Sequence, residues 1–198
     1  MSDALGARCA ALESDWLDAR LARLGHAPNL ALSACAAQPV ADLSLRLRDD
    51  RAVDGPMRFT LDLWPFADAT FGTIAIQHVH EFVANVEALF AEASRVLVPG
   101  GRMLLSGFSA YAWSRWHRLR RGFLVRPQLH SPAQMTRALS RFGFKAERAQ
   151  TVPWPDSRVE RHLPVQSMHA IYLLIALKQP PQWIQRGAMR LPAGVVPG

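Results

Sequence analysis

The feature that most constrains the fold is a strand, helix and strand unit within residues 64–106. Residues 71–77 form a continuous apolar run without polar alternation, which is typical of a strand buried on both faces. An amphipathic helix follows over 86–97, with Asn85 in the N-cap position, and the next strand covers 102–106. A helix between two strands in such short order indicates a right-handed parallel crossover. The unit therefore predicts an open α/β sheet.

Hydrophobic periodicity predicts further elements on both sides of this unit. They are an amphipathic helix over 11–24, strands over 30–34, 43–48, 57–61, 144–152 and 168–177, a turn over 49–56 and a helix over 132–142. Only residues 35–42 separate the first two strands, whereas parallel neighbours need a crossover of about a dozen residues or more. Two arrangements stay open: the first crossover helix is missing, or these two strands run antiparallel.

Length and composition favour one globular domain with a real core. The chain has 198 residues, of which 49% are hydrophobic, and this is the size and apolar content of a single domain. It shows neither a run of eighteen apolar residues nor the pattern of a secretory leader, so we expect a cytoplasmic protein. Cys9 and Cys35 follow no disulfide or zinc-binding pattern.

The basic residues lie mostly in the second half of the chain. Residues 1–100 contain 8 Arg and Lys against 13 Asp and Glu, whereas residues 101–198 contain 15 against 3. Such polarity can direct a chain toward RNA, an anionic lipid surface or an anionic substrate. The sequence is equally compatible with an uneven charge distribution that serves no partner.

Several segments, in the same order along the chain, resemble the second half of class I S-adenosylmethionine (SAM)-dependent methyltransferases of type 11. They are Leu63-Trp-Pro-Phe-Ala-Asp-Ala-Thr-Phe71, Ile76-Gln-His-Val79, Glu92-Ala-Ser-Arg-Val-Leu-Val-Pro-Gly-Gly-Arg-Met-Leu-Leu105, Arg126-Pro-Gln-Leu-His-Ser-Pro132 and Arg141-Phe-Gly-Phe144. The resemblance covers roughly residues 57–178. It implies an α/β fold, a Rossmann-like three-layer sandwich with a mostly parallel sheet, an antiparallel C-terminal strand and a shortened N-terminal part.

The same resemblance suggests how the chain is organised. We expect a single methyltransferase-like domain over residues 1–178, followed by a proline-rich tail over 179–198. Within the domain the expected parts are an N-terminal helix (1–27), a sheet core (28–107), an aromatic and basic lid (108–130) and the final helix and strands (131–178).

The cofactor that the resemblance implies is SAM. Family members carry a glycine-rich loop after the first strand, whereas residues 32–39 of this chain contain no glycine, so the motif is degenerate. By position, the candidate cofactor-binding residues are Ser33 and Ala34 after the first strand, Asp49 after the second, Thr60 and Leu61 in the middle motif, and Gln77 and His78. A solvated turn explains Asp49 equally well, and close packing explains the small residues Ser33 and Ala34.

Methyl transfer from SAM needs correct placement of the acceptor and at most one base, because the methyl group is already activated. His78 matches a histidine that is common in the family just past the fourth strand, and Glu81 lies three residues further on. We therefore predict His78 or Glu81 as the catalytic base, the alternative being that His78 only ends a strand. We expect no metal site, because His78 and His80 lack a third ligand at a diagnostic spacing.

Aromatic and arginine residues are concentrated between Gly107 and Arg126, where the family inserts a variable lid over the acceptor site. The candidate acceptor contacts are Tyr111, Trp113, Trp116, His117 and Arg120, and the candidates for an anionic acceptor or partner are Arg115, Arg118, Arg120 and Arg121. The same residues also suit an amphipathic helix that buries its tryptophans, or a contact with RNA or an anionic membrane.

Three hypotheses of function follow. The first is a SAM-dependent methyltransferase that acts on a small-molecule acceptor, and the retained middle and lid motifs favour it. The second is a methyltransferase-like binding or assembly protein that has lost SAM binding, which the glycine-free segment favours. The third is a binder of an anionic partner through the basic half.

Overall fold

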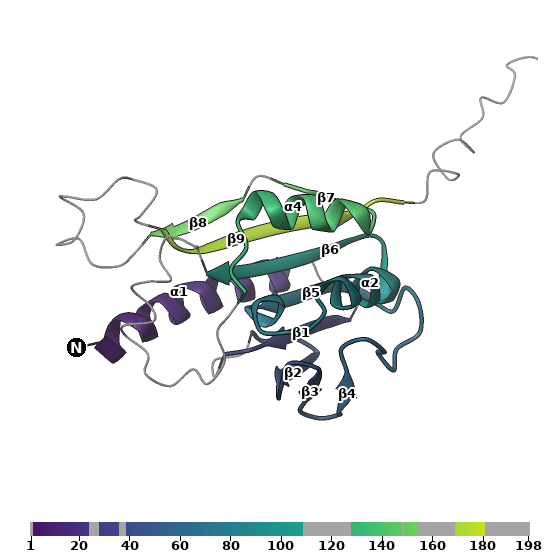
Figure 1. Ribbon diagram of the computed structural model, residues 1–198, viewed down its shortest axis with the longest axis horizontal. Helices are drawn as coiled ribbons and strands as arrows, with labels where there is room; N and C mark the ends of the chain where they lie inside the picture. The colour runs from purple at the N-terminus through teal and green to yellow at the C-terminus, as the bar shows by residue number, and fades with distance from the viewer. Residues whose placement is uncertain are drawn as a thin grey trace, which may run out of the picture.

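The computed structural model describes residues 2–23, 28–35, 39–108, 128–147, 149–153 and 169–180. Figure 1 shows its elements, which we name in chain order. They are α1 (Ser2–Arg23), β1 (Asn29–Ser33), β2 (Leu43–Leu47), β3 (Ala52–Asp54), β4 (Phe59–Thr60), β5 (Phe71–Gln77), the short 3₁₀ helix η1 (Val79–Glu81), α2 (Val86–Val96), β6 (Leu97–Phe108), α4 (Pro132–Arg141), β7 (Phe144–Ala146), β8 (Gln150–Pro153) and β9 (His169–Lys178).

The strands form one mixed sheet in the order β4-β3-β2-β1-β5-β6-β9-β7, with β8 also paired to β9. At its centre β2, β1, β5 and β6 are parallel. At its far side β9 runs antiparallel to β6, and β7 and β8 run antiparallel to β9. The predicted α/β class, with a parallel sheet and an antiparallel C-terminal strand, is confirmed.

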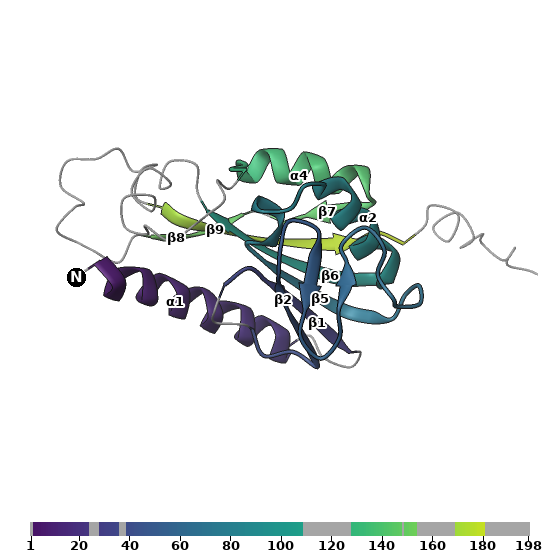
Figure 2. The same cartoon turned by 60° about the horizontal axis from the view of Figure 1, so that its bottom comes forward.

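Helices cover both faces of the sheet, as Figure 2 shows, with α1 on one side and α2 and α4 on the other. Because side chains alternate along a strand, each strand contributes to two cores. Ile76 and Leu105 belong to the large core, which also contains Leu89 of α2. The smaller core on the α1 side consists of Leu17, Leu21, Ala31, Ala75 and Leu104.

The first two strands settle the arrangement that the sequence left open. β1 and β2 are parallel neighbours, with Leu30 opposite Leu43. Residues 34–42 connect them, and the described part of this connection, 34–35 and 39–42, is not helical. The first crossover helix is therefore missing. On this face of the sheet, Leu17 and Leu21 of the long helix α1 pack against Ala31 of β1 and neighbouring strands.

Two elements differ from the sequence prediction. The predicted turn over 49–56 contains strand β3, whose Val53 is fully buried and pairs with Leu47 of β2. The predicted strand over 144–152 is two strands, β7 and β8, which pair with different parts of β9. In both cases backbone pairing with a neighbouring strand decides the outcome, and local propensity does not report that pairing.

Candidate functional site

The carboxyl edge of the parallel strands is the place where open α/β sheets bind ligands, at the point where strand order reverses. Here the reversal lies between β1 and β5, because β1 connects outward to β2 and β5 connects to β6 on the other side. Three polar residues stand in one row at this edge, with Ser33 opposite Gln77 and Gln77 opposite Ser106. All three are fully buried, like the apolar residues that precede them in their strands, but they are polar.

Helix α1 adds a carboxylate to this row. The Ser106 hydroxyl donates a hydrogen bond to Oε1 of Glu13, and Oε2 of Glu13 lies 3.1 Å from Nε2 of His78. The hydroxyl of Ser33 donates to Oε1 of Gln77 over 2.6 Å, whereas Nε2 of Gln77 has no hydrogen-bond partner among the described residues. A buried polar network therefore joins α1 to the carboxyl edge.

His78 lies at the centre of this network and has a left-handed backbone conformation, with φ of 59°. Its Nδ1 lies 2.9 Å from Oε2 of Glu81, so both ring nitrogens contact a carboxylate. Its ring also stacks on Phe108 with 3.9 Å between ring centroids, and the Phe108 amide donates to the other oxygen of Glu81. Left-handed conformations of residues other than glycine are strained, and they occur preferentially at functional sites.

The charges of the network are coupled. Burial lowers the pKa of His78, but the carboxylate of Glu13, supported by Cys35 and Glu81, raises it well above the ordinary value. Burial raises the pKa of Glu13, but the charge and hydrogen bond of His78 lower it overall. Burial also raises the pKa of Glu81, and His78 does not fully offset this. At neutral pH the core of the network is a histidinium paired with the Glu13 carboxylate.

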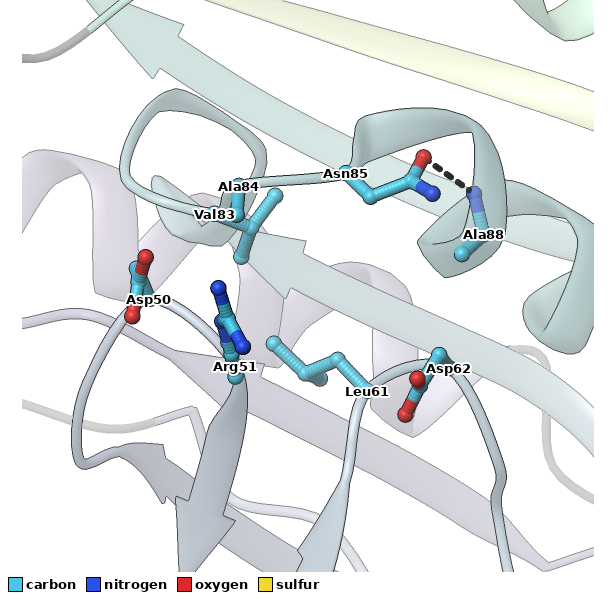
Figure 3. A pocket seen from close by; sticks show the side chains of 8 residues that line it. All are labelled: Asp50, Arg51, Leu61, Asp62, Val83, Ala84, Asn85 and Ala88. Atoms are coloured by element: carbon cyan, nitrogen blue, oxygen red, sulfur yellow. Dashed lines mark hydrogen bonds between the residues drawn. The ribbon is translucent and has the colours of Figure 1, made fainter.

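A cavity of about 230 Å³ lies at the same edge, between the segments that follow β2 and β5. Figure 3 shows its lining residues, which are Asp50, Arg51, Leu61, Asp62, Val83, Ala84, Asn85 and Ala88. The amide of Ala84 donates to the carbonyl of Asp50 over 2.9 Å and so connects the two segments. The cavity offers two carboxylates beside an apolar wall.

The structure brings only some of the predicted cofactor-binding residues to this edge. Leu61 lines the cavity, but Thr60 is an exposed residue of β4 and is not among the lining residues. Asp49 accepts hydrogen bonds from the amides of Arg51 and Ala52 and so closes a turn, while its neighbour Asp50 lines the cavity.

The remaining predicted cofactor residues lie between β1 and β5. Ser33, Gln77 and His78 belong to the buried network. Ala34 is half-buried, and its amide donates to the carbonyl of Gln77 over 2.9 Å. Two groups of predicted residues lie outside the described residues. They are the acceptor candidates Tyr111, Trp113, Trp116, His117 and Arg120, and the candidates for an anionic partner Arg115, Arg118, Arg120 and Arg121.

Glu13 is the main residue that sequence reasoning missed. It precedes Leu17 and Leu21 at spacings of four and eight residues, so it lies on the buried side of α1. An acidic residue in line with core leucines is a signal of a buried, paired carboxylate. Asp50 directly follows Asp49, where the resemblance places an acid for the ribose hydroxyls, but only the fold brings Asp50, Asp62 and Asn85 together around a cavity.

Comparison with known proteins agrees with this fold. Residues 29–105 match the family model described as a methyltransferase domain. A SAM-dependent methyltransferase from Mesorhizobium loti has a similar structure, with a TM-score of 0.55 and 15% identity over 83% of this chain and 97% of that one. No curated protein sequence matches the chain.

Two further solved structures have the same fold. A Haloferax volcanii protein in complex with the methyltransferase activator Trm112 gives a TM-score of 0.54 at 15% identity, over 90% of this chain and 96% of that one. The geranyl diphosphate C-methyltransferase of Streptomyces coelicolor, solved with S-adenosyl-L-homocysteine, gives 0.52 at 15% identity, over 86% and 77%.

The fold is thus that of the class I SAM-dependent methyltransferases. The predicted resemblance is confirmed in that residues 29–105 match the methyltransferase domain model and the structural neighbours are SAM-dependent methyltransferases. Domain and fold together support a SAM-dependent methyltransferase. Among the described residues, none of the helices has the length and apolarity of a membrane span, and no three His, Cys, Asp or Glu side chains gather as metal ligands do.

Proposed function

We propose that the protein transfers the methyl group of SAM to a small-molecule acceptor. The observation that carries the proposal is the cavity between the segments after β2 and β5, at the edge where this fold binds ligands. The activities of the structural neighbours support a methyl transfer reaction and leave the acceptor open.

The cavity residues fit the adenosine half of SAM. Asp50 follows β2, where the resemblance places an acid that accepts hydrogen bonds from ribose hydroxyls. Leu61 and Val83 supply apolar walls for a purine ring, and the carboxylate of Asp62 can accept from its amino group. A volume of about 230 Å³ suits this half of the molecule rather than the whole cofactor.

We propose that the amino-acid half lies near the polar row at the ends of β1 and β5, where this fold binds ligands. Nε2 of Gln77 makes no hydrogen bond of normal geometry among the described residues, although the Gln77 side chain helps to lower the pKa of the nearby Glu13 carboxyl, so a ligand carboxylate there would compete with Glu13. The Ser33 hydroxyl donates a hydrogen bond to Oε1 of Gln77 and so fixes the orientation of the Gln77 amide group. When bound, the cofactor supplies an activated methyl group at this edge.

His78 and Glu81 remain predicted site residues, and we propose a positioning role for them. A base must offer a lone pair within hydrogen-bond reach of the acceptor, whereas both nitrogens of His78 are already bonded to Glu13 and Glu81. In this proposal the pair fixes the strained turn that leads from β5 into η1. The missing glycines of residues 32–39 make the cofactor motif degenerate, but no contact among the described residues favours the alternative of a protein without SAM binding.

Calorimetric titration with SAM and with S-adenosyl-L-homocysteine tests the proposal. We expect both ligands to bind, and Asp50→Asn to weaken binding roughly tenfold, which corresponds to about 1.4 kcal/mol. Asp49→Asn is the matched control, because this neighbouring carboxylate closes a turn and does not line the cavity. Absence of binding to the unaltered protein at millimolar ligand would overturn the proposal.

A further inference from the structure

A second histidine at the carboxyl edge, His80, differs from His78 in its hydrogen bonds. Its Nε2 lies 2.7 Å from the hydroxyl oxygen of Tyr172, and the residue is only 1% exposed. Its Nδ1 is buried and has no hydrogen-bond partner in the described structure. Because buried polar atoms are nearly always hydrogen-bonded, an unpartnered ring nitrogen at a ligand-binding edge indicates a place for a ligand atom.

Three separate elements place this nitrogen. His80 belongs to η1, which directly follows β5. Tyr172 of β9 stands opposite Gly107, near the carboxyl end of β6, where any side chain at 107 would collide with the tyrosine ring. The amide of Gln128 donates to the carbonyl of Glu81 over 2.7 Å and so attaches the segment before α4 to η1.

That segment brings a second unpartnered nitrogen. The His130 ring lies 6.4 Å from the His80 ring between centroids, and its buried Nε2 likewise has no hydrogen-bond partner among the described residues. Two rings at this separation can bind one polar group of a small molecule between them. The two histidines and Tyr172 therefore form a site on the β6 and β9 side of the edge, whereas the cavity lies on the β2 side.

We infer that, in the proposed methyl transfer, Nδ1 of His80 takes the proton from an acceptor with an O–H or N–H group, while Tyr172 holds the ring and His130 contacts the acceptor. The acceptor atom bonds to the methyl carbon as the methyl–sulfur bond breaks, and that electron pair stays on sulfur. The proton released by the acceptor moves to Nδ1 and later leaves to solvent. In this inference His80 is the catalytic residue, and His78 beside it is not.

The surroundings of His80 keep its imidazole in the basic form. Burial lowers its pKa well below the ordinary value, and the charge of His78 and the neighbouring His130 act in the same direction. Burial, reinforced by the Glu81 carboxylate, raises the pKa of Tyr172, so its hydroxyl stays neutral and can accept from the Nε2 proton. Among the described residues, the titratable groups around His80 include its chain neighbour Glu81, together with His78, His130 and Tyr172. The ring of His78, in contrast, has no lone pair to offer.

Nitrogen-15 NMR on histidine-labelled protein saturated with S-adenosyl-L-homocysteine tests the inference, with phenol as the probe for an O–H acceptor. We expect Nδ1 of His80 to be unprotonated and Nε2 to carry the proton across neutral pH, and phenol to shift the Nδ1 resonance. The inference would be overturned if Nδ1 of His80 carried a proton across neutral pH, or if phenol did not shift the Nδ1 resonance. If S-adenosyl-L-homocysteine did not bind at all, that result would instead contradict the proposed function.

Kinetics with radiolabelled SAM provide the second readout. Small hydroxyl and amine compounds are first screened for methylation, and a compound that is methylated then serves as the acceptor. His80→Gln keeps an amide near the Nε2 position for Tyr172 but removes the titrating Nδ1. We expect this variant to bind S-adenosyl-L-homocysteine as the unaltered protein does and to lose roughly 100-fold or more in kcat. An unchanged kcat would refute the role of His80. Tyr172→Phe should reduce kcat less than His80→Gln does, and it should shift the pH profile of kcat.

Discussion

Glu13 and His78 are 65 residues apart in the chain, yet their side chains meet with 3.1 Å between Oε2 and Nε2 in the interior of the protein. Neither side chain is more than 1% exposed. Together with the packing of Leu17 and Leu21 on the sheet, this contact holds helix α1 against the His78 turn. The most polar part of the core and the proposed ligand edge are therefore one network.

Removal of the Glu13 carboxylate should destabilise the protein strongly. Glu13→Ala leaves the His78 charge buried without its main partner, a loss of about 3 to 5 kcal/mol in the free energy of unfolding. Asp15→Ala, at an exposed position of the same helix, should cost much less. Urea unfolding of both variants measures the difference, and equal losses would contradict the role of the Glu13 contact.

The contribution of His78 to stability should depend on pH with a defined sign. The folded-state pKa of His78 is raised, so its stabilisation is fully present below the unfolded value of about 6.5 and is lost as pH rises through the folded value. The difference in unfolding free energy between the unaltered protein and His78→Gln should therefore shrink from pH 6 toward alkaline pH. A difference that grows over this range would show that the imidazolium is not the stabilised form.

Filling the cavity should block ligand binding without unfolding the protein. Ala88 lines the cavity from α2, so Ala88→Leu puts three additional carbon atoms beside it. We expect SAM affinity to fall at least roughly tenfold, which corresponds to about 1.4 kcal/mol. Ala91→Leu is the matched control on the same helix, at an exposed position. Calorimetry checks the prediction, and equal affinities of the two variants would place the adenosine site elsewhere.

Gly107 should not tolerate even a methyl group. A Cβ atom there would lie 2.5 Å from Cζ and Oη of Tyr172, and the ring is buried and cannot easily move. Gly107→Ala should cost about 1 to 3 kcal/mol, in the range of overpacked cores. A second substitution, Tyr172→Ala, should be less harmful in this background than in the unaltered protein. Thermal unfolding of the double-mutant cycle measures the coupling, and simple additivity would show that the two residues do not collide.

Much of the central sheet could be predicted from the sequence. The apolar run of β5, the capped amphipathic helix α2 and the strand after it are local patterns. Burial on both faces accounts for the continuous apolar run of β5. The outer strands at the β4 end of the sheet were harder to predict. β3 is three residues long, and its pairing with β2 decides its conformation, so its own sequence indicated only a turn.

For the site, the sequence by itself determined which polar residues end the buried strands: Ser33, Gln77 and Ser106 follow directly from the strand pattern. Only the tertiary structure decided what those residues meet. Of the two acids after the second strand it placed Asp50 at the cavity, it brought Glu13 to His78, and it left Nδ1 of His80 without a partner among the described residues. The physical reason is that strand periodicity is a property of neighbouring residues, whereas the pairing of buried charges depends on which distant segments the packed core brings into contact.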